Sequence, residues 1–310
     1  MTAPAVLASL AATLTARLPD QVERDAAFGA LTTWRVGGTA AVRVRVERPE
    51  DLAMVAASIT PDVARVVLGR GSNLLVADAG YAGLVIVLGS AFEQVTIGAD
   101  HVIAGGATPL PVLARQCAAA GRRGLGFYVG IPGSVGGAVF MNAGGHGRET
   151  RDVLVDATVA DLDGDATPVV ATASALALGY RHSAVRASQV VLAATFVVEL
   201  GDPGELRNEL SEIVRWRTEH QPGGANAGSV FRNPPGDAAA RLIDEECGLR
   251  GTRVGGAVVS EKHANFIQAD AGATAADVRE LIVQVRDRVV VHTGVRLQPE
   301  VHLVGFDEPW

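Results

Sequence analysis

Gly69-Arg70-Gly71-Ser72-Asn73-Leu74 is the stretch that decides the fold of this chain, because it places closely spaced glycines just after an apolar run. Glycine permits a positive φ and a close approach of the main chain, and successive N–H groups can then form a concavity that binds anions. A second glycine-rich stretch follows later, Ile131-Pro132-Gly133-Ser134-Val135-Gly136-Gly137-Ala138. Two such loops together predict a site for a long, negatively charged ligand such as a dinucleotide.

The first loop departs from the nicotinamide-binding βαβ fingerprint, which needs a third glycine and a helix that opens directly from the loop. Leu74 stands where that glycine would be, and the turn residues Asp78-Ala79-Gly80 precede the apolar run 84–88. The pattern predicts strand, loop, short strand, turn and strand, without a crossover helix. The phosphates would then be held by a loop between strands, although a lone Gly-x-Gly also occurs in plain turns.

Composition and charge narrow the function classes. The chain has 310 residues, 48% apolar and 20% charged, so it is long enough for two or three globular domains. A net charge of −7 argues against nonspecific binding to nucleic acid or to anionic membranes. No apolar run has the length that crosses a bilayer. We therefore expect a cytoplasmic protein with neither a nucleic-acid nor a membrane partner, and we leave protein partners open.

The N-terminus and the cysteines agree with that expectation. Leucines recur at helical spacing in the first twenty residues, which predicts an amphipathic helix rather than a signal peptide: Leu7, Leu10, Leu14 and Leu18. Cys117 and Cys247 lie far apart in helical patterns and are interpreted as buried small hydrophobes in a reducing compartment. The seven histidines never cluster at ligand spacing, so we expect no metal site.

Local patterns predict an α+β chain with mainly antiparallel pairing. Helices are expected from Pro49 to about 59, from Pro109 to Gly121, over 206–214 and over 238–247, and a capping box at Thr274 and Asp277 begins the last helix. Strands are expected at 40–46, 64–68, 154–162, 190–200, 254–259 and 264–268. Residues 201–204 are the best linker candidate. We expect three domains, 1–89 with 299–310 returning to it, 90–200, and 201–298.

Several motifs follow the two glycine loops in order: Met141-Asn142-Ala143-Gly144, Tyr180-Arg181-His182-Ser183, Gly228-Ser229-Val230-Phe231-Arg232-Asn233-Pro234, Ser260-Glu261-Lys262-His263-Ala264-Asn265-Phe266 and Pro299-Glu300-Val301. Together they resemble the UDP-N-acetylenolpyruvoylglucosamine reductases, flavoenzymes of bacterial peptidoglycan synthesis. The resemblance runs from about Leu31 to Gly305. It implies a two-part FAD-binding fold of the vanillyl-alcohol-oxidase type, followed by an α+β domain that binds the sugar-nucleotide substrate.

The resemblance also implies the cofactors and their contacts. NADPH would reduce a bound FAD, which would then reduce the enolpyruvyl ether of the substrate to a lactyl ether. Arg70 stands where related oxidases often carry a histidine that bonds covalently to flavin, so noncovalent FAD is expected. The implied FAD-binding residues are Gly69, Arg70, Gly71, Ser72, Asn73, Leu74, Gly106, Ile131, Pro132, Gly133, Ser134, Gly136, Gly137, Ala138 and Asn142.

Three residues fit the chemistry of that reaction. Hydride addition to the enol ether leaves negative charge that spreads into the neighbouring carboxylate, so a cation and a proton source are needed there. Arg181 can hold the carboxylate with two hydrogen bonds, Ser229 can donate the proton, and Glu300 can assist enolate stabilisation or proton delivery. The implied substrate contacts are Tyr180, Arg232, Asn233, Lys262 and His263; Lys262 is the only lysine in the chain.

Two departures and two alternatives remain. No tyrosine follows Tyr180, and only 47 residues separate Arg181 from Ser229. The chain therefore resembles the shorter subtype, which lacks a tyrosine-bearing loop over the substrate diphosphate. An FAD-dependent oxidase or alcohol dehydrogenase on the same fold is the alternative function. A noncatalytic protein that binds sugar nucleotides is a third reading.

Overall fold

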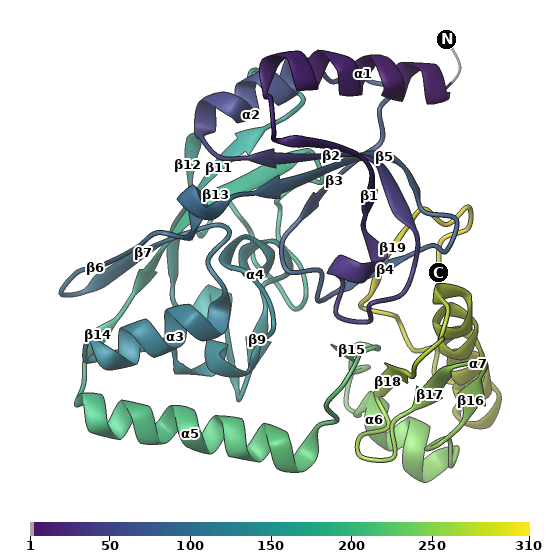
Figure 1. Ribbon diagram of the computed structural model, residues 1–310. Helices are drawn as coiled ribbons and strands as arrows, with labels where there is room; N and C mark the ends of the chain where they lie inside the picture. The colour runs from purple at the N-terminus through teal and green to yellow at the C-terminus, as the bar shows by residue number, and fades with distance from the viewer. Residues whose placement is uncertain (1–2) are drawn as a thin grey trace. The chain divides into compact units, whose positions relative to one another are not determined.

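The computed structural model describes residues 3–310, and its chain is drawn in Figure 1. The chain forms two compact units that exchange segments. Unit 1 comprises residues 1–25, 41–70 and 82–217, and unit 2 comprises 26–40, 71–81 and 218–310. Each unit is described by itself. Among the described residues, no helix is both long and apolar enough to span a membrane.

The first layer contains a four-stranded sheet in the order β1-β2-β5-β3, in which β3 and β5 are parallel. Its strands are β1 (Val22–Ala27), β2 (Thr39–Val46), β3 (Arg65–Leu68) and β5 (Tyr81–Leu88). The helices α1 (Ala3–Arg17) and α2 (Pro49–Ala56) pack against one face of it in unit 1. The four leucines of the predicted N-terminal stripe are all buried in this core, which confirms the amphipathic helix.

The connection from β3 to β5 has the predicted form. It consists of the first glycine loop, the short strand β4 (Leu74–Val76) and a turn, with no helix. A parallel pair normally needs a helical crossover. Here β4 leaves the sheet and pairs in parallel with β19 (His302–Val304) near the C-terminus.

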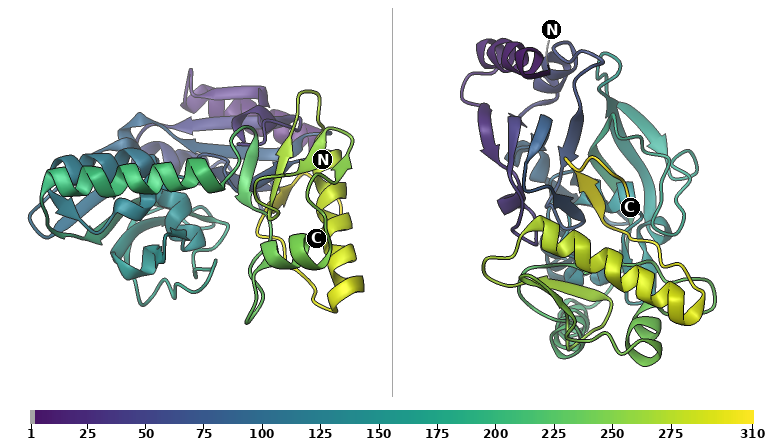
Figure 2. Two further views of the ribbon diagram at one scale, coloured as in Figure 1. Left: turned by 90° about the horizontal axis from the view of Figure 1, so that it is seen from below. Right: turned by 90° about the vertical axis from the view of Figure 1, so that its right-hand side faces the viewer.

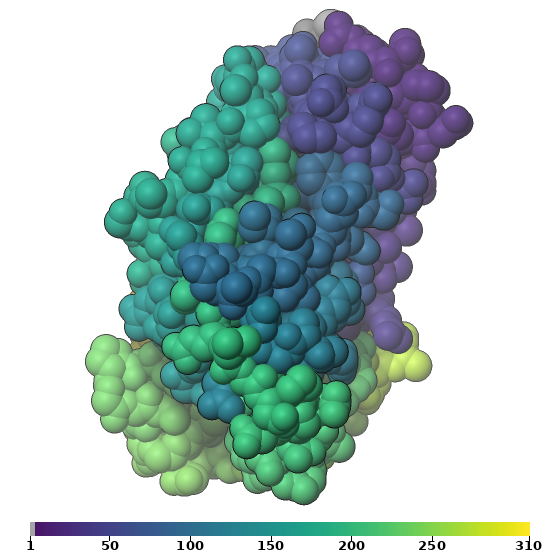
Figure 3. Space-filling view, turned by 90° about the vertical axis from the view of Figure 1, so that its left-hand side faces the viewer, coloured from purple at the N-terminus to yellow at the C-terminus, as the bar shows by residue number. Residues whose placement is uncertain are grey.

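The second layer of unit 1 is an antiparallel five-stranded sheet in the order β12-β11-β13-β7-β6. Its core is packed by large apolar groups such as Tyr128 and Phe196, both fully buried. The strands are β6 (Val95–Ile97), β7 (His101–Gly105), β11 (Leu154–Asp161), β12 (Val169–Thr172) and β13 (Gln189–Val197). The helices are α3 (Leu110–Ala119), α4 (Val135–Met141), which packs on β13 and β7, and α5 (Pro203–His220). The β6–β7 hairpin and part of α5 lie on the face shown in Figure 3.

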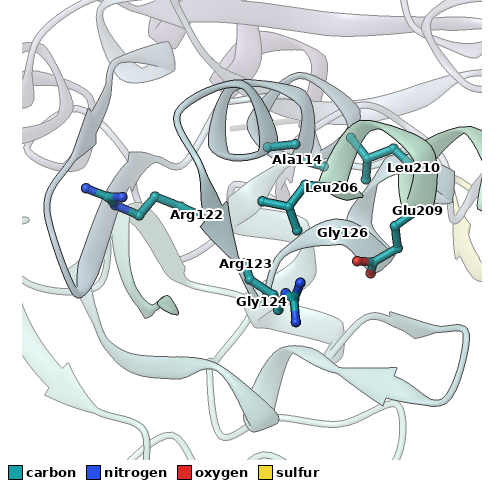
Figure 4. A pocket seen from close by; sticks show the side chains of 9 residues that line it. Ala114, Arg122, Arg123, Gly124, Gly126, Leu206, Glu209 and Leu210 are labelled. Atoms are coloured by element: carbon teal, nitrogen blue, oxygen red, sulfur yellow. The ribbon is translucent and has the colours of Figure 1, made fainter. Parts of the chain in front are cut away.

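Shorter elements complete unit 1. Two small strand pairs are β8 (Arg122–Arg123) with β14 (Glu199–Leu200), and β9 (Gly144–Gly145) with β10 (Arg148–Glu149). The 3₁₀ helices of unit 1 are η2 (Ser90–Glu93), η3 (Gly126–Gly130) and η4 (Thr150–Asp152), and a further one, η1 (Gly29–Leu31), belongs to unit 2. A shallow depression lies between α3, β8 and α5, lined by Leu206, Leu210 and Glu209 among others (Figure 4). It contains none of the predicted site residues.

Unit 2 is built on the antiparallel sheet β15-β18-β17-β16, with α7 packed against it (Figure 2). The indole Nε1 of buried Trp34 donates to the Ile267 carbonyl oxygen at 2.9 Å and so ties the segment 26–40 to this sheet. The elements are β15 (Asn226–Ser229), α6 (Ala239–Arg241), the π-helix η5 (Leu242–Glu246), β16 (Arg253–Val254), β17 (Ala257–Val259), β18 (Phe266–Ala269) and α7 (Ala275–Thr293).

The structure corrects some local predictions. The helix expected over 238–247 is one short α-turn followed by a π-turn, and it ends before Gly248, which has φ of +61°. The strand expected over 254–259 is a hairpin, because Gly255 and Gly256 form a turn between β16 and β17. The helix expected over 206–214 is longer, Pro203–His220, and Val214 within it is 40% exposed. Cys117 is buried as predicted, whereas Cys247 is only partly buried, and both thiols are free.

The N-terminus of α7 is capped from two directions. Thr274 accepts from the Asp277 N–H at 3.0 Å, and Asp277 accepts in return from the Thr274 N–H, as the capping box predicts. Asp78, far away in sequence, accepts from the N–H groups of Ala275 and Ala276, each at 2.9 Å. The first three N–H groups of the helix are therefore satisfied, and a carboxylate also faces the positive end of the helix dipole.

Replacing Asp78 with alanine should remove both of these hydrogen bonds. We expect the free energy of unfolding to fall by about 1 kcal/mol, the usual cost of losing an N-terminal cap. Urea unfolding followed by circular dichroism measures the loss. Asp62→Ala, at an exposed aspartate, is the matched control. Equal stability of the two variants would show that Asp78 does not cap α7.

Candidate functional site

The two glycine loops meet within unit 1. A Cβ added to Gly69 would lie 2.5 Å from the Ser134 hydroxyl oxygen. The first residue of the first loop, directly after β3, therefore lies against the second loop. Ser134 is also the N-cap of α4, where its hydroxyl oxygen accepts from the Gly137 N–H at 3.4 Å. That both loops serve one site stays a prediction.

A second segment pairs with the second loop. The Gly136 N–H donates to the Gly106 carbonyl oxygen at 2.8 Å, and the Val135 N–H donates to the Thr108 carbonyl oxygen at 3.0 Å. The Thr108 hydroxyl is buried, with the residue 1% exposed, and it has no hydrogen-bond partner among residues 3–310. Because a buried hydroxyl without a partner is costly, Thr108 is a polar group that a bound ligand would satisfy. Nothing in the sequence pattern had singled it out.

The first loop presents unpaired main-chain donors in unit 2. Gly71 has φ of +61°, and a Cβ there would lie 2.6 Å from the Leu31 carbonyl oxygen, so only glycine fits. Within residues 3–310, the N–H groups of Gly71, Ser72 and Asn73 donate no hydrogen bond. Three successive free N–H groups, the first of them on a residue in the left-handed conformation, are typical of an anion-binding concavity.

The remaining predicted cofactor residues lie in or beside these loops. Leu74 begins β4. Arg70, Pro132 and Gly137 are exposed, Ile131, Gly133 and Gly136 are half-buried, and Ala138 is buried. In unit 2 the first loop supplies unpaired N–H groups that fit the diphosphate of a cofactor. In unit 1 Thr108 supplies an unsatisfied buried hydroxyl, which fits a polar group of such a ligand. These residues would hold FAD.

Asn142 has a different local role from the one expected. It is 0% exposed, has φ of +45° and caps the C-terminus of α4. Its Nδ2 donates to Glu149 Oε2 at 2.9 Å and to the Gly179 carbonyl oxygen at 2.8 Å, and its Oδ1 accepts from the Arg151 N–H at 2.9 Å. The predicted contact between Asn142 and the flavin stays a prediction, but the side-chain amide is engaged in holding the 149–151 and 179 segments.

Arg181 lies on a tight turn that α4 holds at both ends. Gly179 and His182 exchange two main-chain hydrogen bonds, of 2.9 and 3.1 Å, across Tyr180 and Arg181. Arg181 has φ of +53°, and its guanidinium carbon lies 5.2 Å from the centre of the Tyr180 ring. Asn142 anchors the turn before Arg181, and the Ser183 hydroxyl anchors it afterwards by donating to the Phe140 carbonyl oxygen at 2.8 Å.

Ser229 ends β15 in unit 2. It is paired with Phe266 of β18, and the preceding residue Gly228 has φ of +76° at an irregularity in the register. Asn226 shapes the approach, because its Oδ1 accepts from the Gly228 N–H at 3.0 Å while its Nδ2 donates to carbonyl groups of the preceding loop. The Ser229 hydroxyl makes no hydrogen bond with another atom of the described chain.

The segment after Ser229 pairs with the segment that carries Glu300. Phe231 is opposite Pro299 in an antiparallel bridge, and the Glu300 N–H donates to the Val230 carbonyl oxygen at 2.8 Å. The Glu300 carbonyl oxygen accepts from Asn73 Nδ2 at 3.0 Å, which links this pairing to the first glycine loop. Glu300 is 9% exposed, as the sequence predicted for a partly buried acid. Unit 2 thus brings Ser229, Glu300 and Asn73 onto adjoining segments of the chain.

The predicted substrate residues of unit 2 fall on two neighbouring loops. Arg232 and exposed Asn233 follow Ser229, and the Asn233 Oδ1 accepts from the Ala239 N–H at 3.0 Å. Burial and the Arg232 charge lower the pKa of His302. His263 packs at 4.7 Å from the Phe266 ring, and burial together with the Arg250 charge lowers its pKa. Both imidazoles are therefore favoured in the neutral form at pH 7.

Lys262 is already engaged. Its ammonium donates to the Thr218 carbonyl oxygen, near the end of α5, although the side chain is exposed. A substrate or NADPH contact for Lys262 stays a prediction. Among residues 3–310, no group of three or more histidine, cysteine or acidic side chains could hold a metal ion.

Comparisons with known proteins identify the family. The family model for "UDP-N-acetylenolpyruvoylglucosamine reductase, C-terminal domain" matches residues 220–304, and the model for "FAD binding domain" matches residues 40–169. These matches confirm the α+β fold with an FAD-binding part and a C-terminal part.

Curated relatives and a solved structure agree over nearly the whole chain. The UDP-N-acetylenolpyruvoylglucosamine reductase of Acidiphilium cryptum is 43% identical over 91% of this chain and 91% of its own length. The reductase of Synechococcus sp. (strain WH7803) is 44% identical over 90% and 91%. The crystal structure of UDP-N-acetylenolpyruvylglucosamine reductase (MurB) from Thermus caldophilus has a TM-score of 0.80 at 36% identity, over 92% of this chain and 99% of that one. The chain belongs to the UDP-N-acetylenolpyruvoylglucosamine reductase family.

Proposed function

We propose that this protein uses NADPH, through bound FAD, to reduce UDP-N-acetylglucosamine enolpyruvate to UDP-N-acetylmuramate, a step of peptidoglycan precursor synthesis. The observation that carries the proposal is the strand pairing in unit 2, which holds Ser229 one residue away from the Val230–Glu300 pair. Family membership at 43% identity supports it. A cytoplasmic location is part of the proposal, because two free cysteines favour a reducing compartment.

The chain's residues would hold the cofactor through its diphosphate and along its length. The free N–H groups of Gly71, Ser72 and Asn73 suit the diphosphate, and the Ser134 loop with Thr108 suits the remaining polar atoms. When bound, the reduced flavin supplies a hydride for the terminal carbon of the enol ether. With Arg70 in the first loop rather than histidine, the cofactor is held without a covalent bond to that position.

The protein must then manage the charge and the proton. As hydride reaches one carbon of the double bond, the electron pair moves to the adjacent carbon and into the substrate carboxylate. The Arg181 guanidinium would bind that carboxylate through two hydrogen bonds, which stabilises the enolate more than the ground state. The Ser229 hydroxyl would donate its proton to the carbanionic carbon, and Glu300 would stabilise the enolate or assist the proton delivery. One hydride and one proton thus complete the reduction of the double bond.

Recognition of the sugar nucleotide would fall to the neighbouring polar residues. We assign this role to Tyr180, Arg232, Asn233, Lys262 and His263, which supply cationic and hydrogen-bonding groups for phosphates and sugar. The proposed domains are residues 1–89 with 299–310, 90–200, and 201–298. The parallel pairing of β19 with β4 supports the return of the C-terminus to the first of these.

The proposed proton donor is tested with Ser229→Ala. We expect the purified wild-type protein to carry FAD and NADPH to bleach its flavin absorbance. In the variant, NADPH should still bleach the flavin, while reoxidation by the enolpyruvyl substrate should fall by about 100-fold or more because the general acid is lost. Anaerobic stopped-flow absorbance measures the two half-reactions separately.

The same experiment discriminates the other function classes. Reduced wild-type enzyme that air reoxidises rapidly without the enolpyruvyl nucleotide would indicate an oxidase. A protein that cannot take up FAD would indicate a noncatalytic binding protein. Reoxidation by substrate within about threefold of wild type in Ser229→Ala would remove the assigned role of Ser229.

The anchoring of the Arg181 turn gives a second prediction. Ser183→Ala removes the hydrogen bond to Phe140, so the turn loses one of its two anchors on α4. We expect reoxidation by substrate to slow by about tenfold, because a small misplacement of a catalytic group is costly, while reduction by NADPH is unchanged. Ser174→Ala, at an exposed serine of the same segment, is the control. Equal rates in the two variants would contradict an effect of the anchor on Arg181.

A further inference from the structure

The side chain of Asn265 completes a strand that the main chain leaves unfinished. Asn265 is 4% exposed. Its Oδ1 accepts from the Phe231 N–H at 2.9 Å, and its Nδ2 donates to the Phe231 carbonyl oxygen at 2.8 Å. One side-chain amide therefore satisfies both main-chain groups of a single residue, as a peptide group of a neighbouring strand would.

The local topology leaves the main chain of Phe231 without a neighbouring strand on this side, so a side chain must supply the hydrogen bonds. β15 and β18 pair as far as Ser229 opposite Phe266, and the Val230 N–H still donates to the Asn265 carbonyl oxygen at 2.9 Å. The chain then turns, with the Phe266 N–H donating to the His263 carbonyl oxygen at 3.0 Å, so the ladder does not continue beside Phe231. Phe231 is 1% exposed, so water cannot replace the missing partner.

The opposite edge of the same segment carries Glu300. The Glu300 N–H donates to the Val230 carbonyl oxygen, and the Arg232 N–H donates to the Gln298 carbonyl oxygen at 2.9 Å. Residues 230–232 therefore lie between two hydrogen-bonding partners, the Asn265 turn on one side and the Glu300 segment on the other. A displacement of Phe231 moves Ser229, two residues earlier, relative to Glu300.

We infer that Asn265 is a positioning residue that fixes the register between the Ser229 and Glu300 segments, an inference that rests on the proposed function. Only an amide of this length supplies one donor and one acceptor to the same residue. Aspartate keeps the acceptor but places an oxygen against the Phe231 carbonyl oxygen. Leucine has a similar shape and supplies neither group.

The experiment compares Asn265→Asp, Asn265→Ser and Asn265→Leu with the wild-type holoenzyme, each loaded with FAD. We expect reoxidation of the reduced flavin by UDP-N-acetylglucosamine enolpyruvate to slow by about tenfold or more, because the reacting groups lose their alignment. Reduction by NADPH should stay within about twofold of wild type, since that half-reaction does not use Ser229 or Glu300.

A matched control separates positioning from general loss of stability. Thr274→Ala removes the cap of α7 in the same unit, away from Ser229, and lowers stability without touching the Phe231 segment. It should leave both half-reactions unchanged. Asn265→Ser, which is small enough to admit a water molecule, carries the test if Asn265→Leu does not fold.

The possible failures are distinguishable. If reduced wild-type enzyme is not reoxidised by the enolpyruvyl nucleotide, the proposed function fails, and this inference fails with it. If wild type reacts and the Asn265 variants stay within about twofold in both half-reactions, only the inference fails. A parallel fall of both half-reactions would also overturn it, because that result indicates general damage. In a Ser229→Ala background, Asn265→Asp should add less than about threefold, since the two changes act through the same step.

Discussion

The structure of unit 2 depends on one constraint, which is that buried main-chain groups must find hydrogen-bond partners. At Phe231 no strand is available on one side, and the amide of Asn265 takes its place. The pairing on the other side then brings Glu300 to a defined position, and Asn73 secures the Glu300 carbonyl oxygen from the first glycine loop. The proposed proton donor Ser229, the proposed acid Glu300 and the first glycine loop are thereby linked by hydrogen bonds that engage the main chain of residues 230 and 300.

The same constraint is relaxed where a ligand is expected. The N–H groups of Gly71, Ser72 and Asn73 have no partner among residues 3–310, and neither does the buried Thr108 hydroxyl. The buried Thr108 hydroxyl is costly for the protein alone, whereas Ser72 and Asn73 are half-buried. Successive N–H groups beside a glycine with a positive φ are suited to binding an anion. The side-chain atoms of Asn142, which follows the second loop, are engaged with the chain.

Sequence patterns predicted the elements whose information is local. The capping box of α7 and the helix-free connection from β3 to β5 are confirmed, because capping residues and turn residues are neighbours in the chain. The π-turn of η5 was missed, because tertiary packing overrides the local preference for an α-helix. The hairpin at Gly255 was missed, because a two-residue turn interrupts what the apolar pattern indicates as one strand. Motif order indicated Arg181, Ser229 and Glu300, but it could not show their anchors. The side chain of Asn142 bonds a residue 37 positions away, that of Ser183 one 43 positions away, and that of Asn265 one 34 positions away. Sequence periodicity does not indicate hydrogen bonds between residues so far apart.

The charge of the protein places a further demand on the site. With a net charge of −7, the chain as a whole repels a ligand that carries a diphosphate and a carboxylate. Attraction must therefore come from short-range groups, and the first loop supplies main-chain dipoles whose strength does not depend on protonation. Burial and the charges of nearby arginines lower the pKa values of His263 and His302, which favours the neutral form of both imidazoles. Because a peptide N–H group does not ionise near pH 7, any contribution of the first loop to anion binding would not change with pH in that range.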